Sequence, residues 1–303
     1  TADPRSAERV GQLRLPDGRT LSYATFDAES DAERVGPDDR PWVVVLDGPG
    51  SRGLARAAAP AAATLGIRLA APDRAGFGAT SEASDRGIAD WPADHAALLD
   101  ALGTECAGIL GQSGGTPYAL AAAAALRERV PAVALVGALA PLEEPANMAT
   151  AGRQLRGGVK LARRAPWLLR LVLRGAARGA RKDPERAARK VMKDAPPADV
   201  AVLEDPALWA LHVRVTAEIL GRPAALAGEI GLLARAWGVD LAAVTCPVAL
   251  WSGECDETHP TAHSRWLAAR LGAAPVRVVP GAATFGMLPV YGDALRFAAG
   301  GSV

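Results

Sequence analysis

The sequence has few of the features that build disulfides, metal sites or membrane spans. Its three cysteines, Cys106, Cys246 and Cys255, are an odd number without paired metal-ligand spacing, so we expect reduced thiols. No apolar run reaches the length of a membrane span, which predicts no stable membrane insertion. The first residues, Thr-Ala-Asp-Pro-Arg, lack the charged-then-apolar pattern of a signal peptide. These absences predict a soluble, cytoplasmic protein without a metal or other cofactor.

A strong net charge is also missing. The formal charge of +1 at pH 7 argues against a general nucleic-acid-binding protein. The charge is nevertheless uneven, because 14 Lys or Arg stand against 3 Asp or Glu between residues 150 and 195. The abundance of Arg and Ala resembles residue usage in bacteria with high-GC genomes.

Short apolar runs alternate with helical patterns along the chain. The length of 303 residues suits one α/β domain with an inserted subdomain. Strands that alternate with helices predict a mostly parallel, doubly wound sheet. The predicted strands lie in a hairpin at residues 13–23 and in runs at residues 42–46, 68–72, 107–110, 132–139, 247–251 and 276–279.

A helix-rich segment separates two of these strands. Residues 146–243 show helical spacing interrupted by several prolines. We therefore predict a helical cap at 146–243, inserted into a core formed by residues 1–145 and 244–303.

One motif carries an explicit chemical meaning. Gly111-Gln112-Ser113-Gly114-Gly115 lies between a predicted strand and a predicted helix, the context in which Gly-x-Ser-x-Gly lifts a serine hydroxyl above a sheet. The N–H of the residue after the serine then faces the reaction centre at a helix N-terminus. A purely structural turn is the simpler alternative.

With this motif and three others in order, the chain resembles the α/β-hydrolase superfamily from about Leu13 to Phe297. The others are Gly48-Pro49-Gly50-Ser51-Arg52-Gly53, Asp73-Arg74-Ala75-Gly76-Phe77-Gly78, and Gly253-Glu254-Cys255-Asp256 followed by Pro260. The resemblance implies a catalytic serine at Ser113, the triad acid at Asp256, and oxyanion donors at the N–H groups of Gly48 and Gly114.

The chain departs from that pattern at the catalytic histidine. The family motif Pro-Gly-x-Gly-His-Phe corresponds to Pro280-Gly281-Ala282-Ala283-Thr284-Phe285, which places Thr284 where the base is expected. A serine hydroxyl is a poor nucleophile without a neighbouring base, and threonine has no suitable basicity near pH 7. Ordinary serine hydrolysis is therefore not expected, and Ser113 becomes a candidate anchor for a bound substrate.

The oxyanion loop shows a second departure, since Asp47 stands where the family has glycine. If its side chain turns into the loop, we expect a hydrogen bond to the local backbone. If it faces the pocket, its charge repels a developing oxyanion, and Asp47 becomes the best acid/base candidate.

Four histidines are present, none of them after His263. His259 lies three residues beyond Asp256, and we expect it to reach Ser113 only if that loop is reorganised. His212 of the cap is a candidate for the pocket lining, whereas His263 is expected to face away and His95 to be structural.

The remaining substrate-binding candidates include three aromatic side chains. Trp167, Trp209 and Trp237 are predicted, with Gln112, His212 and His259, to line a pocket for a bulky apolar or polycyclic small molecule. The alternative places the tryptophans in the cap core. The basic stretch from Leu161 to Arg174 predicts either a membrane-surface or anion-binding element or, more simply, a cap helix with a solvated Arg face.

Three functions remain open. The first is a cofactor-independent, non-hydrolytic reaction in natural-product biosynthesis, such as bond formation, cyclisation or lyase chemistry, in which Ser113, Asp256, Thr284 and Asp47 orient the substrate and transfer protons. The second is a serine esterase with a displaced histidine, and the third is a small-molecule-binding protein without catalysis. The sequence is also compatible with a homodimer.

Overall fold

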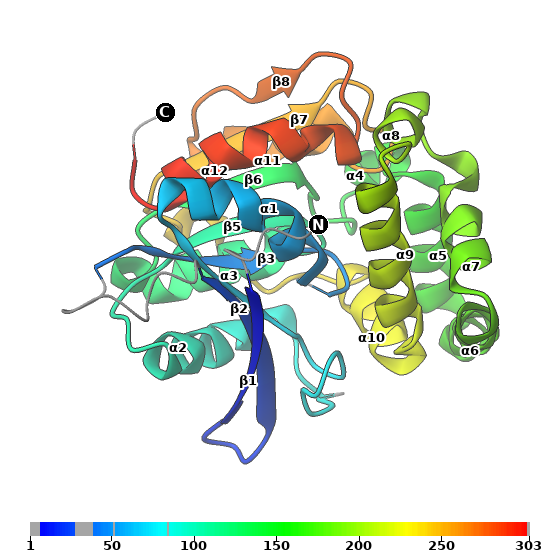
Figure 1. Ribbon diagram of the computed structural model, residues 1–303, viewed down its shortest axis with the longest axis horizontal. Coiled ribbons are helices and arrows are strands. Elements are labelled where there is room, and N and C mark those ends of the chain that lie inside the picture. Colours follow the sequence, from blue (N-terminus) through cyan, green and yellow to red (C-terminus); the bar gives the residue numbers. More distant parts are fainter. Residues whose placement is uncertain (1–6, 28–38, 51, 84, 302–303) are drawn as a thin grey trace.

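An eight-stranded sheet forms the centre of the molecule (Figure 1). The computed structural model describes residues 7–27, 39–50, 52–83 and 85–301; Ser51 of the oxyanion loop and the first six residues lie outside these ranges. The strands are β1 (Ala7–Arg14), β2 (Thr20–Asp27), β3 (Trp42–Leu46), β4 (Arg68–Pro72), β5 (Gly108–Ser113), β6 (Val133–Ala138), β7 (Val248–Gly253) and β8 (Arg277–Val279). Their order across the sheet is β1-β2-β4-β3-β5-β6-β7-β8.

The sheet has the predicted mostly parallel, doubly wound topology. The hairpin of β1 and β2 joins it through an antiparallel contact between β2 and β4, and the strands from β4 to β8 are parallel to one another. Strand β3 shows why its sequence is continuously apolar: Val43 and Val45 pack on one face, while Val44 and Leu46 pack on the other. The core therefore occupies both faces of the sheet.

Helices cover each face. Helices α1 (Arg52–Leu65) and α12 (Tyr291–Ala298) pack on one side, and α2 (Trp91–Ala101), α3 (Thr116–Leu126) and α11 (Thr261–Leu271) pack on the other. Short 3₁₀ turns complete the described elements: η3 (Ile88–Asp90), η4 (Arg127–Arg129), η5 (Met192–Asp194), η6 (Leu241–Ala243) and η7 (Phe285–Val290).

Seven helices lie between β6 and β7, where the sequence predicts a cap. They are α4 (Pro145–Thr150), α5 (Arg153–Arg164), α6 (Pro166–Lys182), α7 (Pro184–Val191), α8 (Pro197–Val202), α9 (Pro206–Leu220) and α10 (Pro223–Leu233). Six of them begin with proline, because a missing N–H costs nothing in the first helical turn. We call α5 to α10, residues 153–233, the helical insertion; it stacks to one side of the sheet (Figure 1).

Candidate functional site

Ser113 ends β5 in a strained turn. Its φ of +52° lies in the left-handed region, which no other non-glycine residue in the described part of the chain adopts. The neighbouring glycines permit this turn: a Cβ at Gly115 would lie 2.0 Å from the carbonyl oxygen of Leu46, and one at Gly111 would lie 2.9 Å from Leu135. The Gly-x-Ser-x-Gly turn predicted from the sequence is therefore present, and it explains both glycines.

The serine lines a cavity of about 270 Å³ between the core and the helical insertion. Aliphatic side chains form much of its wall, and seven of them come from the insertion: Val191, Val202, Leu203, Leu208, Leu211, Val215 and Ile219. Six further residues predicted for the site line this cavity together with Ser113. They are Asp47, Gly48, Gln112, His212, His259 and Thr284. An apolar wall around a few convergent polar groups is typical of a small-molecule site.

Asp256 follows β7 and is held as an anion close to this cavity. Its Oδ1 accepts hydrogen bonds of 2.8 Å from the N–H groups of Thr258 and His259, and its Oδ2 accepts one of 3.0 Å from Thr284 Oγ1. Burial acts to raise the pKa of Asp256, but the charge of His259 and these hydrogen bonds outweigh it and hold that pKa below its usual value.

Thr284, which the sequence motif predicts at the position of the base, donates its hydroxyl hydrogen bond directly to Asp256. The next residue begins η7, and its N–H donates to Asp199 Oδ1 at 2.6 Å. Asp199 belongs to α8, so the helical insertion holds the loop that carries Thr284. No motif in the sequence marks Asp199, because its partner lies 86 residues away.

His259 lies beside Asp256 on the loop after β7. The described structure shows no hydrogen bond between His259 and Ser113, so the expectation that His259 reaches the serine only after a reorganisation of this loop stays a prediction. The two hydrogen bonds to Asp256 Oδ1 fold the loop tightly and bring His259 Nδ1 to 3.4 Å from Asp256 Oδ2. The side chain is buried and lines the cavity. The pairing of β5 with β6 places His259 on the same side of the site as Ser113. Ser113 pairs with Ala138, and a Cβ built on the residue before it, Gly137, would lie 3.9 Å from His259 Nδ1.

Asp47 combines the two orientations considered for it. Its Oδ1 accepts a 2.6 Å hydrogen bond from the Gly48 N–H, and the residue also lines the cavity. Burial raises the pKa of Asp47 to about 6, against the opposing effects of the Gly48 hydrogen bond and of the positive charges of Arg74 and His259. The Gly48 N–H, predicted to serve an oxyanion, is thus occupied in this structure. The Gly114 N–H remains the second predicted donor, and Gly114 lies against Gly48: a Cβ on it would be 3.4 Å from Gly48 Cα.

A buried ion pair connects the oxyanion loop to the helical insertion. Arg74 Nε lies 3.0 Å from Glu229 Oε1 of α10, and Arg74 also donates to the carbonyl oxygen of Gly48. Tyr118 OH donates to Glu229 Oε1 at 3.0 Å, and Arg74 lies over the Tyr118 ring at 4.5 Å. The motif Asp73-Arg74 can be recognised in the sequence, but no sequence pattern identifies Glu229 of the insertion as the partner of Arg74.

Removal of the carboxylate from this pair should destabilise the fold. We expect Glu229→Gln to lower the free energy of unfolding by about 3 kcal/mol, because it removes the carboxylate that pairs with the buried Arg74 guanidinium. The matched control is Glu218→Gln, which breaks the half-exposed pair with Arg56 and should cost about 1 kcal/mol or less. Urea unfolding of both variants measures the difference, and equal midpoints would contradict the prediction.

Gln112 faces the cavity next to the serine and is held by a residue that the sequence did not single out. Its Oε1 accepts a 2.8 Å hydrogen bond from Tyr291 OH at the start of α12. Tyr291 also lines the cavity, and burial raises the pKa of its hydroxyl. Tyr291 therefore stays protonated and fixes the Gln112 amide.

The three tryptophans predicted for the pocket lie elsewhere. Trp167 is 67% exposed on α6, and Trp237 is buried in the core cluster that also contains residues of α2 and α3. Trp209 packs against His212, with ring centroids 5.7 Å apart, and does not itself line the cavity. The spacing of residues along a helix does not indicate which face points inward or which element covers it. The surroundings of these tryptophans could therefore be determined only from the tertiary structure.

The other two histidines have structural surroundings. His95 is fully buried, and burial followed by the charge of Arg129 lowers its pKa to about 3. His263 Nε2 lies 2.9 Å from the carbonyl oxygen of Asn147 and 3.1 Å from Thr150 Oγ1. Neither lines the cavity, in agreement with the prediction.

Comparison with known proteins gives the same architecture. Residues 41–166 match a family model described as alpha/beta hydrolase fold. No curated protein matches the sequence significantly. Similar solved structures include a serine hydrolase from Cycloclasticus zankles (TM-score 0.68, 15% identity, covering 97% of this chain and 99% of that one) and a hydrolase from Pseudomonas aeruginosa (0.66, 21%, 96% and 98%). An enol-lactonase from Burkholderia xenovorans is also similar (0.64, 20%, 95% and 96%).

Proposed function

Because the chain has the α/β-hydrolase fold, we propose that it is a serine hydrolase that uses Ser113, His259 and Asp256. The observation that carries this proposal is the position of His259, beside Asp256 and in the wall of the cavity that holds Ser113. The case for a non-hydrolytic reaction depended on the lack of a base, and a displaced histidine removes that reason. The hydrolase activities of the similar structures also favour hydrolysis.

The proposed reaction proceeds through an acyl-enzyme. Ser113 Oγ attacks the substrate carbonyl carbon while His259 Nε2, the ring nitrogen away from Asp256, takes its proton. The ionised Asp256 stabilises the imidazolium and fixes its orientation. The Gly114 N–H donates to the oxyanion, His259 returns the proton to the leaving oxygen, and a water molecule then hydrolyses the acyl-enzyme by the same steps.

The cavity favours a compact apolar substrate. A volume of about 270 Å³ with a largely apolar wall suits a short acyl group better than a polycyclic one. We therefore infer that the substrate is an ester or lactone of modest size. This proposal replaces the bulky or polycyclic ligand that was expected from the three tryptophans.

A fluorophosphonate probe tests the proposal directly. Such a probe labels an activated serine, and we expect labelling of the wild type at Ser113 with none in Ser113→Ala. The matched control Ser252→Ala removes a buried serine of β7 that hydrogen-bonds Thr261, and it should leave the labelling intact. An unlabelled wild type would refute the proposed mechanism.

Asp47 supports a second candidate. Its pKa of about 6 suits a general acid/base, and its carboxylate occupies the Gly48 N–H that a hydrolase needs for its oxyanion. In this alternative, Asp47 transfers a proton in a lyase or cyclisation reaction and Ser113 anchors the substrate. Turnover without probe labelling, together with loss of turnover in Asp47→Asn, would favour it.

The serine mechanism predicts a specific dependence on pH. Below pH 6 Asp47 is protonated and resembles asparagine, whereas above pH 6 its negative charge opposes the oxyanion. The ratio of kcat/KM for Asp47→Asn to that of the wild type should thus be near one at low pH and rise by up to about tenfold per pH unit above 6. Rates of ester hydrolysis between pH 5 and 8 measure this ratio, and a ratio independent of pH would contradict the prediction.

A further inference from the structure

The outer part of the helical insertion has a strongly one-sided charge. Residues 153–182, which form α5 and α6, contain ten Lys or Arg and no Asp or Glu. Within the described part of the chain, none of the ten forms an ion pair with a carboxylate. Such a concentration of uncompensated charge attracts a polyanionic surface.

The same region exposes large apolar side chains. Trp167, Leu171 and Val172 of α6 are 67%, 53% and 53% exposed, while Leu169, Ala177 and Ala180 of the same helix are buried. The inner side of α6 therefore already has its apolar contacts, and the three outer side chains form an additional apolar patch among arginines. Isolated exposed apolar residues are ordinary, but Trp167 and Leu171 lie four residues apart on one face of the helix, and Val172 adjoins Leu171, so the three are not isolated.

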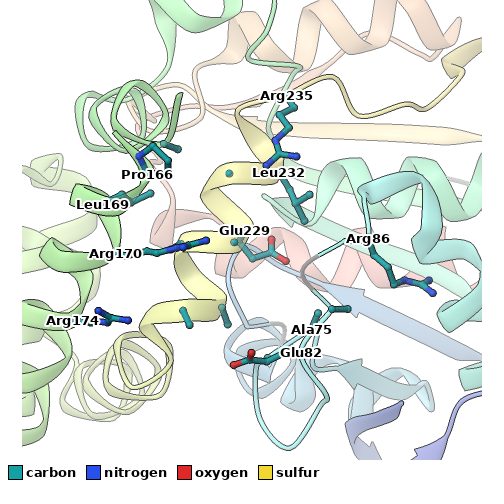
Figure 2. A pocket seen from close by; sticks show the side chains of 18 residues that line it. Ala75, Glu82, Arg86, Pro166, Leu169, Arg170, Arg174, Glu229, Leu232 and Arg235 are labelled. Atoms are coloured by element: carbon teal, nitrogen blue, oxygen red, sulfur yellow. The ribbon is translucent and has the colours of Figure 1, made fainter. Parts of the chain in front are cut away.

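A hollow adjoins this patch. A cavity of about 400 Å³ lies between α6, α10 and the loop after β4, and Arg170, Arg174 and Arg235 line it (Figure 2). Arg170 and Arg174 extend from α6 toward α10 (Figure 2). Glu229 also lines the cavity but is paired with Arg74, and Glu82 lies in its wall. Positive groups thus predominate both on the outer face and in the hollow beside it.

We propose that the outer face of α6, formed by Trp167, Leu171 and the exposed side chains of Arg170, Arg174 and Arg178, docks together with the neighbouring basic residues of α5 on the surface of an anionic lipid bilayer. Tryptophan and aliphatic side chains enter the interface between headgroups and acyl chains, and the surrounding arginines bind anionic headgroups. The exposed apolar patch favours a bilayer over a nucleic acid, whose phosphates would satisfy only the arginines. The contact is peripheral, since no described helix has the length and hydropathy that crossing a bilayer requires.

Vesicle sedimentation of the full chain tests this surface and requires no enzymatic readout. We expect binding to vesicles of phosphatidylcholine that contain roughly 30–40% phosphatidylglycerol, and weak binding to vesicles of pure phosphatidylcholine. High salt should abolish the binding to the anionic vesicles. The triple variant Arg170→Gln/Arg174→Gln/Arg178→Gln and the double variant Trp167→Ala/Leu171→Ser should each weaken the partition coefficient by about tenfold or more.

Matched variants outside the insertion serve as controls. Arg9, Arg14 and Arg265 are exposed arginines for which the described structure shows no ion pair, and their triple Gln variant should bind as the wild type does. Val10→Ser, at a site 59% exposed on β1, is the apolar control. Absence of binding to anionic vesicles, equal losses in the test and control variants, or tighter binding to duplex DNA than to vesicles would overturn the proposal. Because serine labelling is measured separately, failure here leaves the hydrolase mechanism unaffected.

Discussion

Replacement of His259 by alanine should lower kcat for ester hydrolysis by about a thousandfold or more, because Ser113 then has no base. His259 is the histidine that lies beside a carboxylate and lines the serine cavity. Steady-state kinetics with a short-chain p-nitrophenyl ester measure the loss. Since KM reports binding by the aliphatic wall, it should change far less than kcat.

Two further variants separate a catalytic loss from a general disturbance of the cavity. His212→Ala removes the other histidine in the cavity wall, which contacts Phe285 and Trp209, and should reduce kcat by less than about tenfold. The double variant His259→Ala/Thr284→His returns an imidazole to the position from which Thr284 now bonds Asp256, and we expect partial recovery. A His259→Ala variant as active as the wild type would exclude His259 as the base.

The second large effect is a gain. Asp47→Gly should raise kcat for ester hydrolysis by more than about a hundredfold at pH 8, because it frees the Gly48 N–H and also removes a negative charge beside the oxyanion. One oxyanion donor is worth a factor of this size, and the charge adds to it above pH 6. The same kinetic assay measures the gain.

Asp47→Asn divides that gain into its two parts. Asparagine removes the charge, but its carbonyl oxygen can still accept the Gly48 N–H, so its gain at pH 8 should be smaller than that of Asp47→Gly. If both variants lose turnover, Asp47 participates in the chemistry and the acid/base candidate is favoured over the serine mechanism. The pair of variants therefore decides between the two functions.

The fold and the elbow were predictable from local patterns. The strands β3, β5, β6 and β7 are short apolar runs bounded by turn residues, and such runs are typical of strands covered on both faces. The strained turn at Ser113 requires glycines at fixed spacing, so its sequence signal is strong. Features of this kind depend on neighbours within a few residues and can be read from the chain alone.

The base and its surroundings were less predictable. His259 reaches Asp256 because two backbone N–H groups bind the carboxylate and close the loop, a geometry that sequence spacing leaves open. Glu229 lies 155 residues from Arg74, and a single sequence carries no signal for a pair so far apart. The prediction that three tryptophans line the pocket was wrong for a related reason. Helical spacing does not reveal whether a given face of a helix contacts solvent, the core or a ligand.

The contact of Arg74 with both Glu229 and Gly48 has a thermodynamic consequence. Movement of α10 away from the sheet must either break this pair or pull the Gly48 loop with it, so the position of α10 and the shape of the Gly48 loop are linked equilibria. A ligand that stabilises α10 in its present position against the sheet also stabilises the present conformation of Gly48. A ligand that stabilises this conformation of Gly48 stabilises the position of α10 by the same coupling free energy.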